Sequence, residues 1–327
     1  MNPAPKVSVL IPAYNYGHML DDAITSVLNQ SFNDFELIIV DNCSHDNSTQ
    51  VVSNYLTDER IKYYKNDINI GLSRNWNKCL ELAKGKYLKF LCADDKFHPQ
   101  LLERYVQIME ENQNISIITC KKQEFTNHSL TDKICDAPFN GLVNGHEIIK
   151  YIILNDKNIL GSPTRVMFRK DNLSIGQFRN YKFITDLEMW VRHLCIGDCY
   201  FLNDVLAFGR IHDGQQQINS KKYSEDRIEY YHFYRSLLQG NYAIDNQIIS
   251  RSFIQQCIKR IAIKCTYNFY KHLPKISSQK HRKSLYILFK IGLFEKLIIS
   301  PHLLEFIKEG INKKEISKFK NSMKVKA

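Results

Sequence analysis

The first 120 residues of the chain alternate between two hydrophobic periods, and this alternation restricts the folds that the chain can adopt. Runs rich in β-branched and aromatic residues predict strands at residues 6–11, 35–40, 60–64, 87–93 and 115–120. Apolar residues at helical spacing predict helices between them, over residues 17–29, 48–56, 73–83 and 99–111. This order predicts an α/β fold with a parallel, twisted sheet and helices on both of its faces.

Polar residues follow three of the predicted strands at equivalent positions, where an open α/β sheet binds its ligands. The first strand leads into Pro12, Ala13, Tyr14 and Asn15, the second into Asp41 and Asn42, and the fourth into Asp94 and Asp95. Adjacent carboxylates repel each other, so a pair at the mouth of a buried sheet is expected to hold a cation or a sugar hydroxyl. Taken alone, the same pair would suit a solvated turn.

Composition argues against several classes of protein. The chain has 327 residues, of which 44% are hydrophobic, as in ordinary globular proteins. No apolar run approaches the roughly 20 residues of a membrane span, and the N-terminus lacks the basic and apolar regions of a signal peptide. The nine cysteines are scattered without a Cys-x-x-Cys pair, which argues against a disulfide framework or a zinc site. A cytoplasmic location is therefore expected.

The positive charge is concentrated in the last third of the chain. Residues 1–220 carry 23 Lys and Arg against 26 Asp and Glu, whereas residues 221–327 carry 22 against 8. Apolar residues at helical spacing over 253–269 predict a basic helical C-terminal region with one apolar stripe. Such helices favour peripheral attachment to the inner face of the cell membrane. The alternatives are an ordinary helical subdomain with charged outer faces, or a surface that binds nucleic acid.

Several motifs in a fixed order carry a family resemblance. They are VSVLIPAYN at 7–15, SVLNQS at 26–31, FELIIVDNCS at 35–44, NIGLSRN at 69–75 and GKYLKFLCADD at 85–95. With these motifs the chain resembles the family 2 glycosyltransferases of the GT-A fold, especially bacterial members that assemble surface polysaccharides. The match is dense over residues 6–100, and separated motifs continue to about residue 215. The resemblance implies a Rossmann-like GT-A domain over 1–220, followed by the helical region over 221–327.

The resemblance divides this domain into a nucleotide-binding half, residues 1–120, and an acceptor-binding half, residues 121–220. In the family the loop after the first strand packs around base and ribose, the acid after the second strand bonds uracil, and an Asn-x-Gly-x-x-Arg stretch adds contacts. The residues that the resemblance assigns to the nucleotide sugar are Pro12, Ala13, Tyr14, Asn15, Asp41, Gly71, Arg74 and Asp94. Local roles stay open for two of them, an Asx turn for Asp41 and a solvated helix face for Arg74.

The acidic motif implies a divalent metal. By resemblance Asp95 would ligate Mg²⁺ or Mn²⁺, which bridges the diphosphate of the donor, while Asp94 faces the ribose or the donor sugar. His212 lies in a late Arg-x-His motif whose His meets the diphosphate or the metal, although a single His is as readily a packed or surface residue. Cys92 stands where the commonest form of the motif has another Asp, and a neutral thiol is a poor ligand for a hard cation. We therefore expect two useful acids at this site.

The second half of the chain supplies a candidate base. The stretch from Thr185 to Arg192 resembles the acid and Trp-containing helix of the family. Asp186 would then take the proton of the acceptor hydroxyl as that oxygen attacks the anomeric carbon from the opposite side, which inverts its configuration. Glu188 is the second choice. The local alternative for Asp186 is an N-cap of the helix that carries Trp190.

The function expected from the sequence is inverting transfer of a sugar from a nucleotide-diphosphate sugar, most readily a UDP-sugar, to a saccharide or lipid-linked saccharide. A sugar-nucleotide pyrophosphorylase is one rival, but its Gly-rich, basic loop after the first strand is missing from residues 13–17. A non-catalytic nucleic-acid binder built on the basic third is the other rival, and it predicts salt-sensitive binding to DNA or RNA. With the motifs in view, no nucleic-acid partner is expected.

Overall fold

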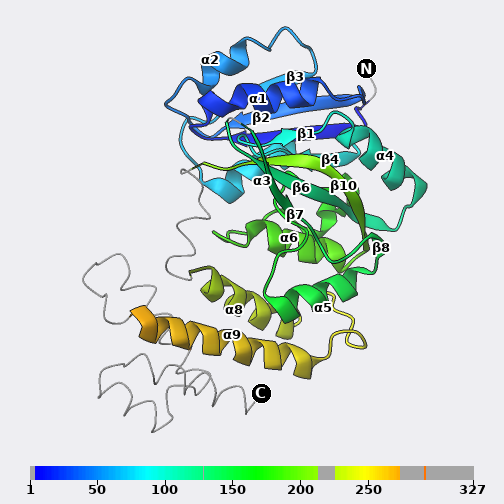
Figure 1. Cartoon of the computed structure of the whole chain (residues 1–327), viewed down its shortest axis with the longest axis vertical. Coiled ribbons are helices and arrows are strands. Elements are labelled where there is room, and N and C mark those ends of the chain that lie inside the picture. Colours follow the sequence, from blue (N-terminus) through cyan, green and yellow to red (C-terminus); the bar gives the residue numbers. More distant parts are fainter. Residues whose placement is uncertain (1–3, 128, 213–224, 273–290, 292–327) are drawn as a thin grey trace.

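The computed structural model describes residues 4–127, 129–212, 225–272 and 291, and a mixed sheet lies at its centre (Figure 1). The strands in the described residues are β1 Val7–Ala13, β2 Phe35–Asp41, β3 Ile61–Lys65, β4 Tyr87–Phe90, β5 Lys96–Phe97, β6 Ile115–Phe125, β7 Leu130–Cys135, β8 Gly141–Val143, β9 Met167–Arg169 and β10 Asp198–Arg210. Their order is β3-β2-β1-β4-β9-β6-β10-β5, with β7 paired to β6 and β8 to β10. The α/β class expected from the sequence is confirmed.

The first half of the sheet forms as the alternation of periods predicts. β1 pairs in parallel with β2 and β4, and β2 pairs in parallel with β3 at the edge. β2 is buried along its whole length, because helices cover both of its faces. The carboxyl ends of β1, β2 and β4 therefore meet at one edge of the sheet.

The expectation of an all-parallel sheet is wrong beyond β4. β9 lies between β4 and β6 and runs antiparallel to both of them. β7, β8 and α5 (Gly145–Asn155) stand between β6 and β9 in the chain, so the connection between these two strands is not a simple strand–helix–strand crossover. Instead, β9 enters from a loop at residues 156–166, which brings that loop to the carboxyl end of β4. β6 and β10 then resume a parallel pairing.

Two groups of helices cover the two faces of the sheet. The apolar residues of α1 (Gly17–Leu28), α2 (Ser48–Ser53) and α4 (Leu101–Glu111) join one buried cluster. Those of α3 (Leu72–Leu82), α5 (Gly145–Asn155) and α6 (Thr185–Leu194) join the other. Alternate residues of β2 divide between these clusters, with Leu37 and Ile39 on the first face and Ile38 and Val40 on the second.

The C-terminal helices pack onto the second face. α8 (Glu225–Leu238) and α9 (Arg251–His272) contact each other, and α9 also contacts α5. The apolar stripe expected on α9 is buried in the same cluster as the sheet, as Ile258, Ile261 and Cys265 show. The stripe therefore does not form a free apolar surface for a membrane. Residues 284–300, which are also rich in Leu, Ile and Phe, lie outside the described residues, apart from Ile291.

Charged residues of α9 also bind the body of the molecule. Asp156 follows α5 in the left-handed conformation, and its carboxylate accepts hydrogen bonds from Arg260 at 2.8 Å and from Lys264. Some of the basic charge of this region is thus neutralised inside the fold. Within the residues that the structure describes, no helix is both long and apolar enough to cross a membrane.

The packing of α9 predicts the stability of two Ala variants. Ile261 is 1% exposed, so Ile261→Ala is expected to lower the free energy of unfolding by about 2–5 kcal/mol. Leu154→Ala is the control, because Leu154 is 52% exposed on α5, and its change is expected to stay within about 0.5 kcal/mol. Denaturant unfolding measures both values. Equal values for the two variants would contradict the burial of α9.

Candidate active site

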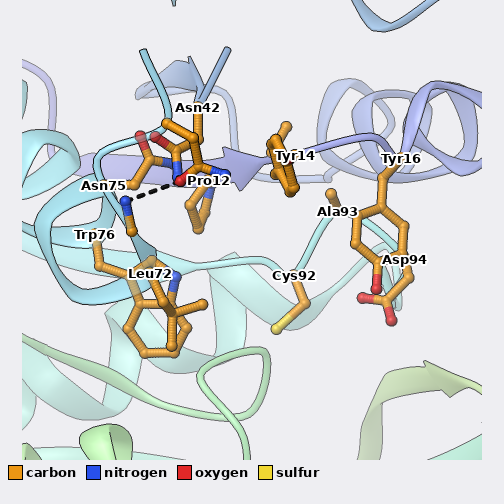
Figure 2. Close-up of a pocket in the computed structure, with 13 residues that line it drawn as sticks. Pro12, Tyr14, Tyr16, Asn42, Leu72, Asn75, Trp76, Cys92, Ala93 and Asp94 are labelled. Carbon is orange, nitrogen blue, oxygen red and sulfur yellow. Dashed lines mark hydrogen bonds between the residues drawn. The ribbon is translucent and has the colours of Figure 1, made fainter. Parts of the chain in front are cut away.

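A pocket with a volume of about 400 Å³ opens at the carboxyl ends of β1, β2 and β4. Figure 2 shows Trp76 and Leu72 on one side of the pocket, Tyr16 and Asp94 on the other, and Cys92 between them. The lining residues are Pro12, Ala13, Tyr14, Tyr16, Asn42, Asn69, Gly71, Leu72, Asn75, Trp76, Cys92, Ala93 and Asp94. The walls thus combine apolar and aromatic side chains with amides and one carboxylate, which suits a ligand with a ring and polar groups.

The structure brings together five of the residues expected at the nucleotide sugar. They are Pro12, Ala13, Tyr14, Gly71 and Asp94, and all of them line the pocket. Tyr14 is 41% exposed, so its ring is accessible to a ligand. Gly71 has a φ of 87° at the start of α3 and leaves open space where a side chain would stand.

Three other expected residues lie outside the lining of the pocket. Asn15 accepts a hydrogen bond from the backbone of His45, and Arg74 is exposed on the first turn of α3. Asp41 is fully buried below the pocket. Its carboxylate accepts bonds from the Ser44 backbone N–H at 2.8 Å and the Tyr63 hydroxyl at 2.8 Å. This is the local, turn-stabilising role that stayed open for Asp41 in the sequence.

A network of asparagines forms the pocket wall beside Asp41, and the sequence did not single it out. Asn42 donates to Asn69 and accepts from Asn66, and Asn66 also donates to Asn75. The side-chain Oδ1 of Asn69 accepts the backbone N–H of Gly71 at 2.9 Å, so the network also fixes the start of α3. Three of the four asparagines line the pocket. The sequence feature that could have indicated this network is Asn42, because it directly follows Asp41 at the end of a predicted strand.

Asp95 is the more buried of the two adjacent acids, with 5% of its surface exposed. One carboxylate oxygen accepts the Thr164 hydroxyl at 2.5 Å, and the other accepts the backbone N–H of Arg210 at 3.1 Å. Burial, with the nearby charge of Asp94, raises the pKa of Asp95 to about 6. These donors come from chain segments far away in sequence, so the position of this acid depends on the whole fold.

Asp94 points into the pocket and contacts His212. The distance between its Oδ2 and the His212 Nε2 is 3.1 Å. The ring of His212 also packs edge-on against Tyr16, with centroids 5.7 Å apart. Burial, together with the charge of Asp94, raises the pKa of Tyr16 to about 12, so this phenol stays protonated and can donate a hydrogen bond. His212 thus lies beside the acidic turn, and its expected contact with the diphosphate or the metal stays a prediction.

Arg210, from the same late motif, holds the acidic turn in place. Its side chain donates to the backbone oxygen of Asp94 at 3.0 Å and to the carboxylate of Asp22 at 2.5 Å. It also donates to Asn127 and stacks over the ring of Phe125, with a distance of 4.5 Å to the centroid. The guanidinium therefore ties the end of β10 to the end of β4. Sequence reasoning did not assign it a role of its own.

The acidic turn has a donor set that fits a hard divalent cation. Ligand atoms of Cys92, Asp94 and Asp95 lie within 4.8 Å of one another. The carboxylates are the ligands that Mg²⁺ and Mn²⁺ prefer. Burial raises the pKa of the Cys92 thiol well above its usual range, so the sulfur stays protonated and adds little for such an ion. The two aspartates therefore carry the metal-binding capacity of this group.

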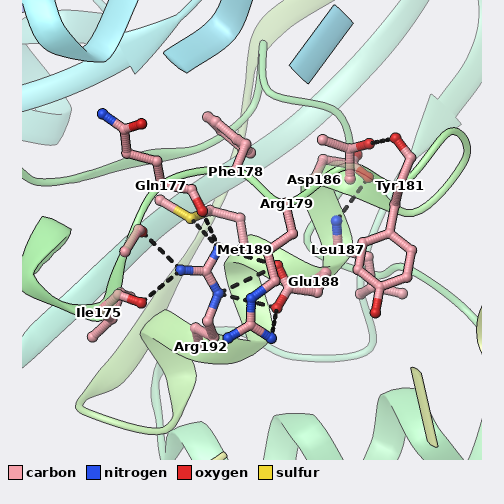
Figure 3. Close-up of polar contacts among 12 residues, drawn as sticks. Ile175, Gln177, Phe178, Arg179, Tyr181, Asp186, Leu187, Glu188, Met189 and Arg192 are labelled. Atoms are coloured by element: carbon pink, nitrogen blue, oxygen red, sulfur yellow. Dashed lines mark hydrogen bonds and ion pairs between the residues drawn. The ribbon is translucent and has the colours of Figure 1, made fainter. Parts of the chain in front are cut away.

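Glu188 and Asp186 lie close together on α6 but have different surroundings (Figure 3). Glu188 is fully buried and bonds the guanidinium groups of Arg192 and Arg179, each at 3.0 Å, and the hydroxyl of Tyr242 at 2.8 Å. Since its oxygens are occupied by cations, Glu188 is held as a structural anion. This arrangement makes it a poor candidate for a base.

Asp186 is half-buried, and within the described part of the chain its carboxylate accepts hydrogen bonds from neutral donors. Asn158 donates to its Oδ2 at 3.2 Å, and the backbone N–H of Leu187 donates to its Oδ1 at 2.7 Å. Burial raises its pKa to about 6. Ile184 is the N-cap residue of α6, so the alternative of Asp186 as N-cap does not apply. A carboxylate with a raised pKa near neutrality is suited to accept a proton.

The sequence model of the Glycosyl transferase family 2 matches residues 8–175, which is more than half of the chain. The chain belongs to this family. It is 33% identical over 209 residues to a putative teichuronic acid biosynthesis glycosyltransferase, TuaG, of Bacillus subtilis, covering 63% of this chain and 79% of that relative. An uncharacterized glycosyltransferase of Rickettsia typhi is 25% identical and aligns over 94% of this chain and 93% of its own length. The protein is thus a glycosyltransferase.

Solved structures confirm the GT-A type of fold. Staphylococcus aureus TarS, crystallised with UDP-GlcNAc, matches with a TM-score of 0.63 and 18% identity over 86% of this chain and 79% of that chain. The mannosyltransferase PcManGT from Pyrobaculum calidifontis, in complex with GDP-Man and Mn²⁺, matches with a TM-score of 0.53 and 10% identity over 90% of this chain and 88% of its own. At these identities the likeness supports the fold alone.

Because the two acids on α6 have different environments, we expect their substitution to change the free energy of unfolding by very different amounts. Glu188→Gln is expected to lower the free energy of unfolding by about 3–5 kcal/mol, because it leaves the buried Arg192 without its anion. Asp186→Asn is expected to change it by less than about 1 kcal/mol, since the ionised form of Asp186 is already disfavoured by burial. Urea unfolding at pH 7 compares them. A loss for Asp186→Asn as large as for Glu188→Gln would refute this division.

Proposed function

We propose that this family 2 glycosyltransferase transfers a sugar from a UDP-linked donor to a saccharide or lipid-linked saccharide acceptor, with inversion at the anomeric carbon. The observation that carries the proposal is the pocket itself, where an aromatic and amide-lined wall ends at the carboxylate of Asp94, next to the buried carboxylate of Asp95. The crystallised complexes of TarS with UDP-GlcNAc and with UDP support a UDP-linked donor for this chain. The name of the TuaG relative supports a place in the synthesis of a surface polysaccharide.

In this proposal the pocket holds the nucleoside part of the donor. Tyr14 and Leu72 offer exposed apolar surface for a base, and Asn42 and Asn69 place amide groups on the same wall. Asp94 lies where the ribose or the donor sugar meets the acidic turn. Asn15, Asp41 and Arg74 act around this pocket without lining it, so we assign them supporting roles at the nucleotide.

Asp95 would hold Mg²⁺ or Mn²⁺, with Asp94 and His212 beside it, and the ion would neutralise the diphosphate leaving group. Hydrogen bonds from other parts of the chain already orient the two acids in the structure. The Thr164 hydroxyl and the Arg210 backbone N–H orient the carboxylate of Asp95, and the side chain of Arg210 fixes the backbone of Asp94. Both acids are therefore held in one arrangement before a donor binds.

Asp186 is the base in this mechanism. Its surroundings of neutral donors leave it free to accept the proton of the acceptor hydroxyl, whereas Glu188 is neutralised by two guanidinium groups. The proton moves from the attacking oxygen to the carboxylate of Asp186 as the bond from that oxygen to the anomeric carbon forms. The C–O bond to the diphosphate breaks on the opposite face, which inverts the configuration.

We further propose residues 1–120 as the nucleotide-binding half, residues 121–220 as the acceptor-binding half, and residues 221–327 as a basic helical region. Attachment of that region to the inner face of the cell membrane remains part of the proposal. Since the stripe of α9 is buried, the attachment would have to use basic surface or residues outside the described ranges. The pyrophosphorylase and nucleic-acid-binding alternatives gain no support from the pocket or the relatives.

Binding of the nucleotide is tested by thermal unfolding with UDP and Mn²⁺. Saturating ligand at about 100 times its Kd is expected to stabilise the protein by about 2.7 kcal/mol, which raises the Tm by several degrees. Asp95→Ala is expected to abolish this rise. Asp204→Ala, which removes a half-exposed acid that pairs with Arg104 on the surface, should keep it. A Tm of the parent protein that does not respond to UDP and Mn²⁺ would count against the proposal.

The role of Asp186 predicts a pH dependence. Because the base acts only when ionised and its pKa is raised to about 6, the rate should fall about tenfold per pH unit below pH 6. Asp186→Asn is expected to lower the rate by about 10²–10⁴-fold while the binding of UDP stays unchanged. Release of UDP from a panel of UDP-sugars measures the rate. A full rate in Asp186→Asn would exclude this residue as the base.

A further inference from the structure

One short segment of the chain touches both the acid of the donor side and the proposed base. At its start, the side-chain amide of Asn158 donates to the Oδ2 of Asp186 at 3.2 Å. At its end, the hydroxyl of Thr164 donates to the Oδ2 of Asp95 at 2.5 Å. Residues 158–164, which we call the bridging segment, thus connect two carboxylates that come from different elements of the fold.

The hydroxyl of Thr164 has a defined direction at the donor end. It accepts the backbone N–H of Cys92 at 3.2 Å and donates to Asp95. Thr164 is fully buried, so water does not compete for these bonds. The same hydroxyl therefore fixes the acid and the backbone of the acidic turn at once. Ser can make both contacts, whereas Val, which has the shape of Thr, can make neither.

The middle of the bridging segment is a closed turn. The N–H of Gly161 donates to the Oδ1 of Asn158 at 3.1 Å. The carbonyl of Gly161 accepts from the Nδ2 of Asn158 at 3.3 Å and from the indole N–H of Trp190 at 3.2 Å. Gly161 has a φ of 91°, and a Cβ there would lie 2.4 Å from the side chain of Arg165. The turn is thus held by side chains on both sides and has little freedom to change its shape.

Lys89 anchors the end of the segment to the sheet. It is fully buried in β4, and its Nζ donates to the backbone oxygen of Thr164. The carbonyls of Pro163 and Val166 lie 3.4 Å from the same nitrogen, and that of Phe90 lies 3.3 Å away. A buried ammonium group is costly unless it is surrounded by acceptors. The carbonyls therefore bind the lysine and the segment to each other, on the strand that leads into the acidic turn.

We propose that the bridging segment is a positioning element that holds Asp186 in a fixed place relative to Asp95, with Asn158 and Thr164 as positioning residues and Lys89 as their anchor. The inference rests on the proposed function, in which these two acids act on opposite sides of the bond to be broken. It adds that the two acids are not placed independently. A substitution at Asn158 should therefore affect the position of Asp95, and a substitution at Thr164 should affect the position of Asp186.

Trp190 provides a direct probe of this linkage, because its indole N–H bonds the carbonyl of Gly161. The chain has two Trp residues, so its ¹⁵N–¹H spectrum holds two indole signals, and Trp76→Phe assigns them. Thr164→Val is expected to shift the Trp190 signal and to weaken binding of UDP with Mn²⁺ about tenfold, through loss of a bond to a charged group. Thr164→Ser is the matched control and should restore both readouts.

Asn158→Leu changes the end of the segment at Asp186 and tests whether the end at Asp95 is affected. It also replaces Thr164→Val in the experiment if that variant does not fold. Asn158 does not line the nucleotide pocket, yet its loss should shift the Trp190 signal and weaken the binding of UDP with Mn²⁺ about threefold. Asn155→Leu is the control, because Asn155 is exposed at the end of α5 and its side-chain amide donates to the backbone carbonyl of Tyr151. It should leave both readouts unchanged.

The outcomes separate the two proposals. If the parent protein binds UDP with Mn²⁺ and the Thr164→Ser protein behaves as Thr164→Val does, the hydroxyl has no positioning role and the inference is wrong. An Asn158→Leu protein that binds UDP with parental affinity would also overturn it, since the segment would not transmit. If the parent protein itself fails to bind UDP with Mn²⁺, the proposed function fails first, and with it the catalytic meaning of the segment.

Discussion

The site depends on the way in which the carboxylate of Asp95 is buried. This group follows β4, yet its hydrogen-bond donors come from the loop before β9 and from the end of β10. Each donor requires its own strand to be in place, so the acid is oriented only when the two halves of the sheet have joined. The antiparallel insertion of β9 is therefore a condition of the site, because it delivers Thr164 to the end of β4.

Surroundings also decide the roles of the two acids on α6. Both lie in one turn of one helix, but Glu188 meets two guanidinium groups and a hydroxyl, and Asp186 meets an amide and a backbone N–H. The first arrangement is a group of ion pairs that ties α6 to the loop at 175–179 through Arg179 and Arg192. The second leaves a carboxylate whose pKa burial has raised towards neutrality. The helix thus combines a structural anion with a group that can exchange a proton.

Much of the fold could be predicted from the sequence, because the spacing of apolar residues that marks a strand or a helix, every two or every 3.6 residues, is a local property of the chain. The strands before residue 93 and the polar residues at their ends follow from such patterns, and the ends meet because parallel strands share an edge. Contacts between segments that are distant in the sequence do not produce a local pattern of this kind. Neither the bond of Thr164 to Asp95 nor the burial of Asp41 could be read from the spacing of residues. The apolar stripe of α9 favours membrane attachment when the sequence is considered alone, but the structure buries Ile258, Ile261 and Cys265 against the sheet domain.

The most direct test of this account is a crystal structure of the protein with UDP and Mn²⁺, with the anomalous signal of manganese used to locate the ion. We predict uridine in the pocket between Tyr14, Asn42 and Leu72, and a manganese peak within coordination distance of Asp95. A nucleotide bound elsewhere, such as in the polar pocket around Arg169 and Asn172 at the opposite edge of the sheet, would contradict it. So would a manganese ion that does not contact Asp95.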